Sequence, residues 1–188
     1  MASDTVVVAR AASGSPVLIE LDADANPLRS TEVDELVAAV RAREHAGDVR
    51  WVWPDTTTAY PELLNAGVRV ARAWDLRLVH AILRDAVAVT DDAGLRRATA
   101  WDAASTPPDA GDALFDLGES ASGVPESADE AVAEYRRQHG AIAAAATPGA
   151  LRLLAAAESA GALIAVELHT VGVPWSIEAH ERLLEAEL

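Results

Sequence analysis

The side chains of this sequence best suited to chemistry are carboxylates that follow predicted strands. Asp55 comes after Pro54, directly behind the apolar run at residues 49–53, and Glu20 and Asp22 stand in E-x-D spacing where another apolar run ends. Carboxylate oxygens are the ligands that Mg²⁺ prefers in proteins. An aspartate after proline also forms turns or caps a helix, and the E-x-D pair also suits the exit from a strand into a turn. The sequence therefore offers Asp55, Glu20 and Asp22 as candidate metal ligands, each with a simpler structural interpretation.

Other chemistries find little support in the sequence. Cysteine is absent, which excludes thiol chemistry and disulfides. Neither a G-x-x-x-x-G-K-[S/T] nor a G-x-G-x-x-G loop is present. Trp51 and Trp53 have the rings needed to stack on bases, but alternation with a valine favours packing within a sheet. The histidines show no metal-binding spacing and no pairing with a serine nucleophile, so we interpret them as structural or surface residues: His45, His80, His139, His169 and His180.

The segment from residue 48 to 85 predicts the elements that must position these side chains. The β-branched and aromatic run at 49–53 predicts a buried strand, which Pro54 ends. One of the threonines at 56–58 can cap a helix running to residue 66, and Gly67 can close it. Residues 68–70 predict a second strand. A helix then follows with four apolar side chains on one face: Leu76, Val79, Ile82 and Leu83. This alternation of strand and helix indicates an α/β layer.

The order and spacing of three pieces in this segment resemble the 3′–5′ exonuclease-like domain of family A DNA polymerases, the polymerase I type. The pieces are residues 53–55 (WPD), 63–70 (LLNAGVRV) and 74–83 (WDLRLVHAIL). In that family they form the fourth strand, the helix after it, the fifth strand and the next helix. The resemblance implies an RNase H-like α/β fold, a mixed sheet flanked by helices.

The same resemblance indicates where metal ligands should lie. These exonucleases hold two divalent metals with four carboxylates, which activate the attacking water and neutralise the leaving group. The acids come from D-x-E on the first strand, an aspartate after the fourth, and Y-x-x-x-D or H-x-x-x-D on a late helix. Asp55 occupies the place of the middle aspartate. Asp75 occupies a strand-to-helix junction typical of the family, where it caps the helix.

The remaining acids are missing from their expected places. If the strands predicted at residues 6–10 and 17–21 are the family's first and second, the D-x-E place falls on 6–10, which has no acid. If they are the second and third, the catalytic strand is lost; sheet continuity favours the first alternative. The late motif falls near Ser127 and Ala131, and the nearby Asp129, Glu130 and Glu134 are better explained as solvated residues of a helix face. One matching acid of four cannot hold two Mg²⁺ ions.

A second resemblance lies near the end of the sequence. Residues 153–188 resemble the start of the polymerase domain of family A enzymes, in which a helix ending in E-(L/M)-x-x-x-G-(V/I) is followed by a further helix. The matching residues are Glu167, Leu168, Gly172, Val173, Trp175 and Ser176. This implies an exonuclease-like domain at 1–146 and, at 147–188, a linker with the first polymerase helices. The implied partner is a polymerase domain C-terminal to this segment, and DNA is contacted only through the larger protein.

The rest of the chain predicts further helices and loops. We expect the two N-terminal strands to form a hairpin, a turn at 22–28, and a helix capped by Ser30 or Thr31 that runs to about His45 and ends at Gly47. After residue 85 we expect a short helix, capped by Asp91 or Asp92, that runs through Leu95 to Trp101. A long loop follows at 105–127, in which residues 114–117 (LFDL) dock on the core. The last expected elements are helices at 127–146 and 150–169, a turn at 172–175 and a final helix capped by Ser176.

Composition limits the partners of this chain. The formal net charge is −15, and every one of the 15 basic residues is arginine. Such a chain repels phosphate backbones at long range, so we expect no tight binding of duplex DNA by the chain alone. The N-terminal residues do not form a signal peptide, and no uninterrupted apolar run is long enough to cross a bilayer. We therefore expect a cytoplasmic protein without membrane contact. We expect no cofactor in this segment, and Mg²⁺ only for a parent polymerase or an active exonuclease.

Three hypotheses follow from these observations. The first is a catalytically degenerate exonuclease-like domain that positions a family A polymerase domain. The second is an active 3′–5′ exonuclease that uses unconventional acids: Glu20, Asp22, Asp55 and Asp129. The third is a stand-alone protein-interaction domain whose last helices pack on its body.

Overall fold

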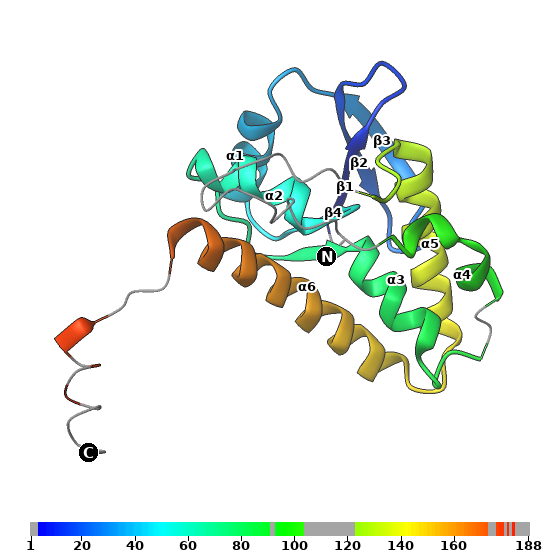
Figure 1. Ribbon diagram of the computed structural model, residues 1–188. Helices are drawn as coiled ribbons and strands as arrows, with labels where there is room; N and C mark the ends of the chain where they lie inside the picture. Colours follow the sequence, from blue (N-terminus) through cyan, green and yellow to red (C-terminus); the bar gives the residue numbers. More distant parts are fainter. Residues whose placement is uncertain are drawn as a thin grey trace.

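The computed structural model describes residues 4–90, 93–103, 123–172, 176–178, 180 and 182. Three strands come first, helices and strands then alternate from α1 to α3, and two long helices complete the second half of the chain (Figure 1). The elements are β1 (Asp4–Arg10), β2 (Pro16–Leu21), β3 (Pro27–Glu32), α1 (Leu36–Ala46), β4 (Val49–Trp53), α2 (Thr56–Asn65), β5 (Ala73–Asp75), α3 (Leu76–Asp85), α4 (Ala93–Arg97), the 3₁₀ turn η1 (Thr99–Trp101), α5 (Ala128–Ala144) and α6 (Pro148–Val171).

The five strands form one mixed sheet in the order β3-β2-β1-β4-β5. β2 is antiparallel to both β1 and β3, while β4 runs parallel to both β1 and β5. Val7 marks the centre of the sheet, because it pairs with Ile19 of β2 on one side and Val52 of β4 on the other. The fold is therefore α/β, with a mixed sheet flanked by helices, as the sequence predicted.

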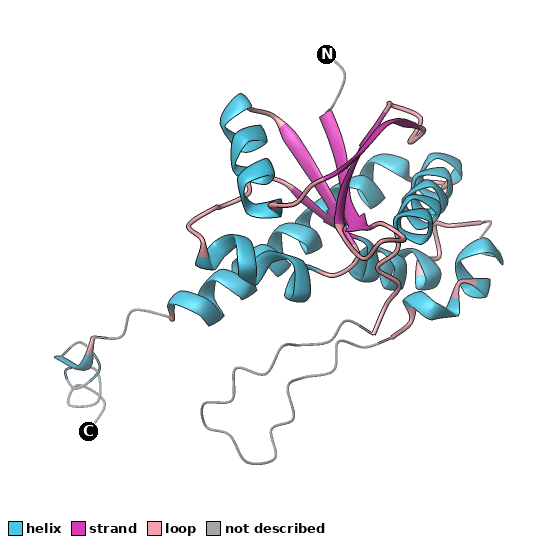
Figure 2. Cartoon of the chain, turned by 90° about the horizontal axis from the view of Figure 1, so that it is seen from above, coloured by secondary structure: helices cyan, strands magenta, loops and turns pink. Residues whose placement is uncertain are grey.

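Alternation along the strands creates a hydrophobic core on each face of the sheet. Val7 of β1 and Val52 of β4 face one side, where they join the buried side chains of α3 and α5. Val6 and Trp51 face the other side and pack with α1 and α2. Figure 2 shows the strands running between these two layers of helices. The apolar runs are nearly continuous in β1 and β4 because both strands are buried on both faces.

Helix α6 covers the edge of the sheet at β5. Its first half places Leu151 and Ala155 in the core that contains α3 and α5, and its second half places Leu163 and Val166 in the core that contains α2. In Figure 1 this helix crosses beneath both layers. By length and composition alone α6 is long and apolar enough to cross a membrane. Within its most apolar 18-residue stretch, 28% is buried inside the protein. A helix of a protein core meets the same criteria, so this observation assigns no membrane location.

The N-terminal hairpin was predicted correctly, but the segment after it was not. Ser30 and Thr31, predicted to cap a helix, lie instead in β3, and α1 begins only at Leu36. β3 is an edge strand whose side chains are mostly exposed, so it lacks the apolar alternation that marks a half-buried strand. The expected turn at 22–28 is therefore shorter, because Pro27 already belongs to β3. Gly47 ends α1 with a positive φ of 95°, as predicted.

The segment from 56 to 75 also differs from its prediction. The cap of α2 is Asp55 and not one of the threonines. Residues 68–70, predicted as a strand, form a link, and the strand is β5 at 73–75. Val68 and Val70 are nevertheless buried. The apolar pattern therefore predicted correctly that these residues are buried, but not which residues pair with β4. Pairing is decided by the partner strand, whose Trp51 lies in register with Ala73.

Where they are described, the helices after residue 85 follow the predictions only in part. Residues 93–97 form α4, and residues 99–101 a 3₁₀ turn, in place of one continuous short helix. Ser127 caps α5, and α6 begins at Pro148, two residues before the predicted start at residue 150. The predicted caps Asp91 and Asp92, the LFDL segment at 114–117 and the turn residues 173–175 lie outside the described residues.

Candidate functional site

Asp55, the strongest candidate from the sequence, is a buried helix cap. It follows the carboxyl end of β4, and its side chain is fully buried. Oδ1 accepts hydrogen bonds from the backbone amide of Thr57 at 2.9 Å and from the Thr57 hydroxyl at 2.8 Å. Oδ2 accepts a hydrogen bond from Arg77 Nε at 2.8 Å. Asp55 is therefore engaged through both oxygens by a helix N-terminus and by a guanidinium cation.

Asp75 plays a matching part for the next helix. Its Oδ1 accepts from the amide of Leu78 at 2.8 Å, which caps α3 as the sequence predicted. Its Oδ2 accepts from the amide of Thr56 at 2.7 Å, the first residue of α2. The backbone amide of Asp75 donates to Ser159 Oγ of α6 at 3.0 Å. Burial raises the pKa of Asp75 above its ordinary value, against the two hydrogen-bonded amides that lower it.

The chemistry at the carboxyl ends of β4 and β5 is that of helix capping. Two helix N-termini meet there, and the two aspartates satisfy amides that would otherwise lack partners. The positive ends of both helices and Arg77 favour anionic carboxylates at this place. Asp55, which the sequence resemblance assigned to a metal site, instead has both oxygens engaged inside the protein. The arrangement serves to join α2, α3 and α6 around the end of the sheet.

Glu20 and Asp22 lie towards the opposite end of the sheet from Asp55. Glu20 pairs in register with Val6, which in turn pairs with Trp51 of β4. Asp55 lies four residues beyond Trp51, which places it on the order of 10 Å further along the strand direction. Glu20 forms an ion pair with Arg43 at 2.7 Å. The candidate carboxylates therefore do not converge on one site.

Asp22 has a local role in the turn between β2 and β3. Its Oδ1 accepts from the amides of Asp24 at 2.9 Å and Asn26 at 2.7 Å. Its Oδ2 accepts from the side-chain amide of Asn26 at 3.1 Å. Hydrogen bonds from Asn26 are the main cause that lowers the pKa of Asp22. This is the strand-to-turn exit that the sequence suggested as the simpler interpretation.

The predicted late-motif positions lie beside β1 but carry no acid. Arg10, the last residue of β1, forms a parallel bridge with Ser127, and Ala131 is buried in the core one turn further along α5. The nearby Asp129 is exposed in the first turn of the helix. Within the described ranges, no group of three or more Asp, Glu or His side chains is arranged to hold a metal ion. The residues present do not fit the two-metal centre that the resemblance implies.

A buried polar network on α3 and α5 was not predicted from the sequence. His80 Nδ1 lies 2.8 Å from Glu134 Oε1, and both side chains are fully buried. The interpretation of Glu134 as a solvated helix residue was therefore wrong. Gln138 donates to the same Oε1 at 2.7 Å and to the Leu76 carbonyl at 2.7 Å. Trp74 Nε1 donates to Gln138 Oε1 at 2.8 Å. The available sequence signals were a histidine between Val79 and Leu83 on an apolar helix face, and Glu and Gln four residues apart on α5.

His80 has a second carboxylate on its other side. Its Nε2 lies 3.4 Å from Asp102 Oδ1 without forming a well-aligned hydrogen bond. Burial lowers the pKa of His80 most strongly, and the charge of Asp102 opposes that shift. Arg84 and Arg137 also border this network, through contacts to Asp102 and Glu134. The network joins α3, α5 and the end of η1.

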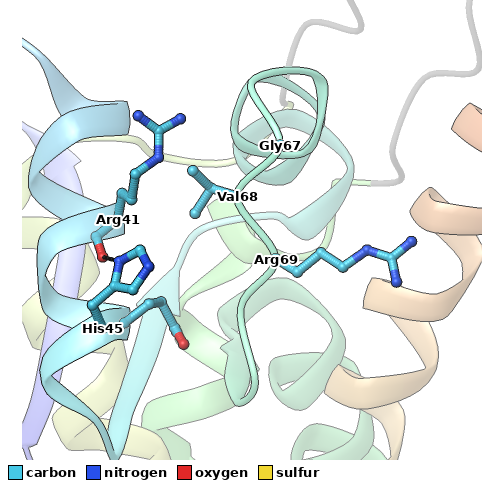
Figure 3. A pocket seen from close by; sticks show the side chains of 6 residues that line it. Arg41, His45, Gly67, Val68 and Arg69 are labelled. Atoms are coloured by element: carbon cyan, nitrogen blue, oxygen red, sulfur yellow. Dashed lines mark hydrogen bonds between the residues drawn. The ribbon is translucent and has the colours of Figure 1, made fainter.

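A shallow pocket of about 300 Å³ lies between α1 and the link after α2 (Figure 3). The Arg41 guanidinium donates to the Ala66 carbonyl at 2.8 Å, and His45 Nδ1 lies 2.8 Å from the Arg41 carbonyl. Glu44, another lining residue, accepts from Trp51 Nε1 at 2.6 Å. These bonds hold α1 against β4 and α2, so the polar groups of this pocket serve the packing of the fold.

No protein-family model matches the chain, and searches of curated proteins and of solved structures give no significant match. The class of protein that the fold and this site define is therefore an α/β protein with a mixed five-stranded sheet, in which the candidate carboxylates are structural.

Proposed function

We propose that this chain is the N-terminal region of a family A DNA polymerase, an RNase H-like, exonuclease-like domain followed by a linker and the first helices of the polymerase domain. Its nuclease site is inactive, and it contributes to DNA replication or repair by docking against the polymerase domain and positioning it. The proposal rests on the sequence resemblance at residues 53–83 and 153–188, and on two features of the structure. One is the construction of the sheet end at Asp55, and the other is an exposed apolar face on α6.

The sheet supports the fold half of the proposal. Three antiparallel strands followed by two parallel ones, with β1 in the centre, are compatible with an RNase H-like arrangement. β1 is central and lies parallel to β4, which supports its assignment as the family's first strand. This favours the alternative in which that strand is present but has lost its acids, since residues 6–10 read VVVAR.

The single observation that carries the inactive half is the engagement of Asp55. Thr57 and Arg77 take up its two oxygens inside the protein, and Arg77 supplies the positive charge that a metal would otherwise bring. Residues equivalent to the other ligands are hydrophobic, small or distant. A carboxylate held in this way contributes to stability and not to phosphodiester hydrolysis.

The exposed face of α6 supports the second part of the proposal, that the chain docks against a polymerase domain. Apolar or small residues recur on its exposed side at alternating spacings of three and four: Leu154, Ala157, Gly161, Ile164, Leu168 and Val171. Ile164 is 57% exposed and Val171 69% exposed. This stripe lies opposite the buried residues of the same helix, such as Ser159 and Val166. A continuous apolar stripe at heptad-like spacing suits packing against another helix.

The polymerase domain is the occupant that the sequence favours for this stripe. Glu167 and Leu168 belong to the segment that resembles the start of that domain, so the stripe and the resemblance lie on the same helix. Glu167 itself is held to the body, because it accepts a hydrogen bond from Tyr60 at 2.8 Å and lies 3.7 Å from Arg69. With α6 fixed in this way, a domain that follows it would meet a rigid apolar surface.

The inactive half is tested with the purified chain, a labelled single strand and Mg²⁺ or Mn²⁺. We expect no metal-dependent 3′ trimming above the background of an Asp55→Ala preparation. Robust trimming that is lost in Asp55→Ala would overturn this half, and would favour the active-exonuclease alternative.

The docking half is tested by titrating the chain into a family A polymerase domain expressed without its own exonuclease-like domain. We expect a heat of binding by calorimetry that weakens at least tenfold in Ile164→Glu and Leu168→Glu. The matched control is Leu28→Glu, which changes an exposed leucine on β3. No binding, or equal weakening by the control, contradicts docking through α6. Co-sedimentation of the chain with phosphatidylcholine vesicles, lost in Ile164→Glu, would assign the stripe to a membrane instead.

A stand-alone interaction domain is a second candidate that the same helix favours, since α6 packs on the body through Leu151, Ala155, Leu163 and Val166. It predicts that the stripe binds a protein other than a polymerase. A reading frame that continues beyond Leu188 into polymerase motifs would exclude it.

A further inference from the structure

A second pocket, of about 440 Å³, opens at the end of the sheet opposite Asp55. Its walls come from the amino ends of β1 and β4, from α5 and from α6. Arg50 of β4, His139 of α5 and Arg152 of α6 contribute basic groups. Trp74, Tyr135, Ile142 and Leu153 contribute apolar surface. The volume falls within the range of pockets that bind small molecules.

The charge of this pocket is opposite to that of the protein. The chain carries 30 acidic and 15 basic residues, yet Asp22 is the acid among the pocket residues, against two arginines and a histidine. Asp22 is already engaged by the amides of its own turn. In an acidic protein, basic groups gathered from three separate elements create a local site that attracts anions.

The two arginines also differ from others in the described part of the chain. Arg43 and Arg77, for example, are paired with carboxylates at 2.7 and 2.8 Å. Neither Arg50 nor Arg152 donates to an acceptor among the described residues. Arg50 lies instead over the Trp74 ring, 6.0 Å from its centroid. A guanidinium with unused N–H groups beside an aromatic surface is suited to bind a carboxylate or phosphate through two parallel hydrogen bonds.

The aromatic wall of the pocket is held in place before any ligand arrives. Trp74 donates its indole N–H to Gln138 at 2.8 Å. Tyr135 packs edge-on against Trp74, with ring centroids 5.8 Å apart and an interplanar angle of 82°, and hydrogen-bonds with Thr5. His139 lies one turn after Tyr135, with ring centroids 6.3 Å apart. A preformed wall reduces the ordering cost of binding.

We propose that this pocket binds a small organic anion, in which a carboxylate or phosphate group contacts Arg50 and Arg152 and an apolar body lies against Leu153, Ile142 and the aromatic wall. The pocket borders the start of the stripe on α6, but no stripe residue lines it. It opens at the end of the sheet opposite Asp55, so the proposal does not depend on the proposed function. Phosphate and carboxylate ligands share the required chemistry, and the experiment below distinguishes them.

The test follows the indole ¹H–¹⁵N signal of Trp74, assigned with a Trp74→Phe variant, while benzoate or phenyl phosphate is titrated. We expect a saturable shift with a dissociation constant on the order of 1 mM for ligands of this size. Loss of a charge-assisted contact in Arg50→Ala or Arg152→Ala should weaken binding roughly tenfold or more. Arg152→Ala is the cleaner variant because Arg152 is exposed, and Arg29→Ala on β3 is the matched control.

Each outcome decides part of the proposal. Tighter binding of one of the two anions identifies the preferred anionic group. No saturable shift with either anion up to 50 mM (about fifty times the expected constant) overturns the site, as does equal binding of neutral benzyl alcohol. Equal binding of inorganic phosphate overturns the apolar part. Equal weakening by Arg29→Ala would show a non-specific charge effect and also overturn the assignment.

Discussion

Arg77 Nε donates a hydrogen bond to Asp55 Oδ2 at 2.8 Å, which links the first turn of α3 to the cap of α2. The Asp55 side chain is fully buried and that of Arg77 is 18% exposed. Removing one partner from such a pair leaves the other charge unpaired, which costs more than the net value of the pair. The pair therefore makes the position of α3 depend on a residue that sequence resemblance assigned to a metal site.

Replacing Asp55 should destabilise the protein according to how many of its hydrogen bonds the new side chain can still form. We expect Asp55→Ala to lower the free energy of unfolding by about 3 kcal/mol, because it removes both the cap of α2 and the partner of Arg77. Asp55→Asn keeps an oxygen for the Thr57 amide and should cost about half as much. Urea unfolding measures both. The control is Asp24→Ala in an exposed turn, and equal destabilisation by the two Asp55 variants would contradict the structure.

Asp75→Asn should be costly because the carboxylate serves two helices at once. An amide group offers one acceptor oxygen, so either the Thr56 or the Leu78 amide would face an NH₂ group. We expect a loss of about 2–4 kcal/mol in the free energy of unfolding. Asp24→Asn, the same chemical change in an exposed turn, should alter stability by less than about 0.5 kcal/mol. A near-neutral Asp75→Asn would show that one of these two bonds does not form.

Stability should fall as the pH drops below the ordinary pKa of histidine, and His80 should account for part of that fall. Burial lowers the pKa of His80 in the folded state, so the unfolded state binds a proton more readily below about pH 6.5. The free energy of unfolding then decreases with falling pH, by at most about 1.4 kcal/mol per pH unit for this one proton.

The contribution of His80 is isolated by comparing the wild type with His80→Asn in urea unfolding between pH 5 and 8. Among the described residues, the charged groups that face this ring are Glu134 and Arg137 from α5, Asp102 after η1, and Arg84 and Asp85 from its own helix. The variant should show a shallower dependence on pH than the wild type. Identical slopes would mean that His80 does not titrate differently in the folded and unfolded states.

The hydrogen bond between Tyr60 and Glu167 of α6 should make the free energy of unfolding fall at high pH. Burial, followed by the hydrogen bond to Glu167, raises the pKa of Tyr60 to about 12. A folded-state pKa above the unfolded value of 10 gives stability that is present below pH 10 and lost as the pH rises towards 12. Tyr60→Phe should cost about 1 kcal/mol at pH 7 and lose this alkaline dependence. A Tyr60→Phe protein with the wild-type alkaline transition would contradict the assignment.

The sequence predicted elements correctly where apolar patterning and chain breakers agree. Residues 49–53 are apolar except for Arg50 and end at proline, and they form β4. Gly47 and Ser127 mark helix boundaries because their local roles need no distant partner. β3 escaped prediction because an exposed edge strand has no apolar pattern, and β5 was misplaced because register with β4 decides which extended residues pair.

By itself, the sequence determined the α/β class, the buried strands at the centre of the sheet and the capping role of Asp75, because these follow from local patterns and short-range hydrogen bonds. Only the tertiary structure determined which partners the polar side chains contact. Arg77, His80 and Glu134 acquire their partners from elements up to 54 residues apart in the chain. Which carboxylate meets an arginine, and which arginine remains without one, depends on how helices cross the sheet and cannot be derived from spacing along the chain.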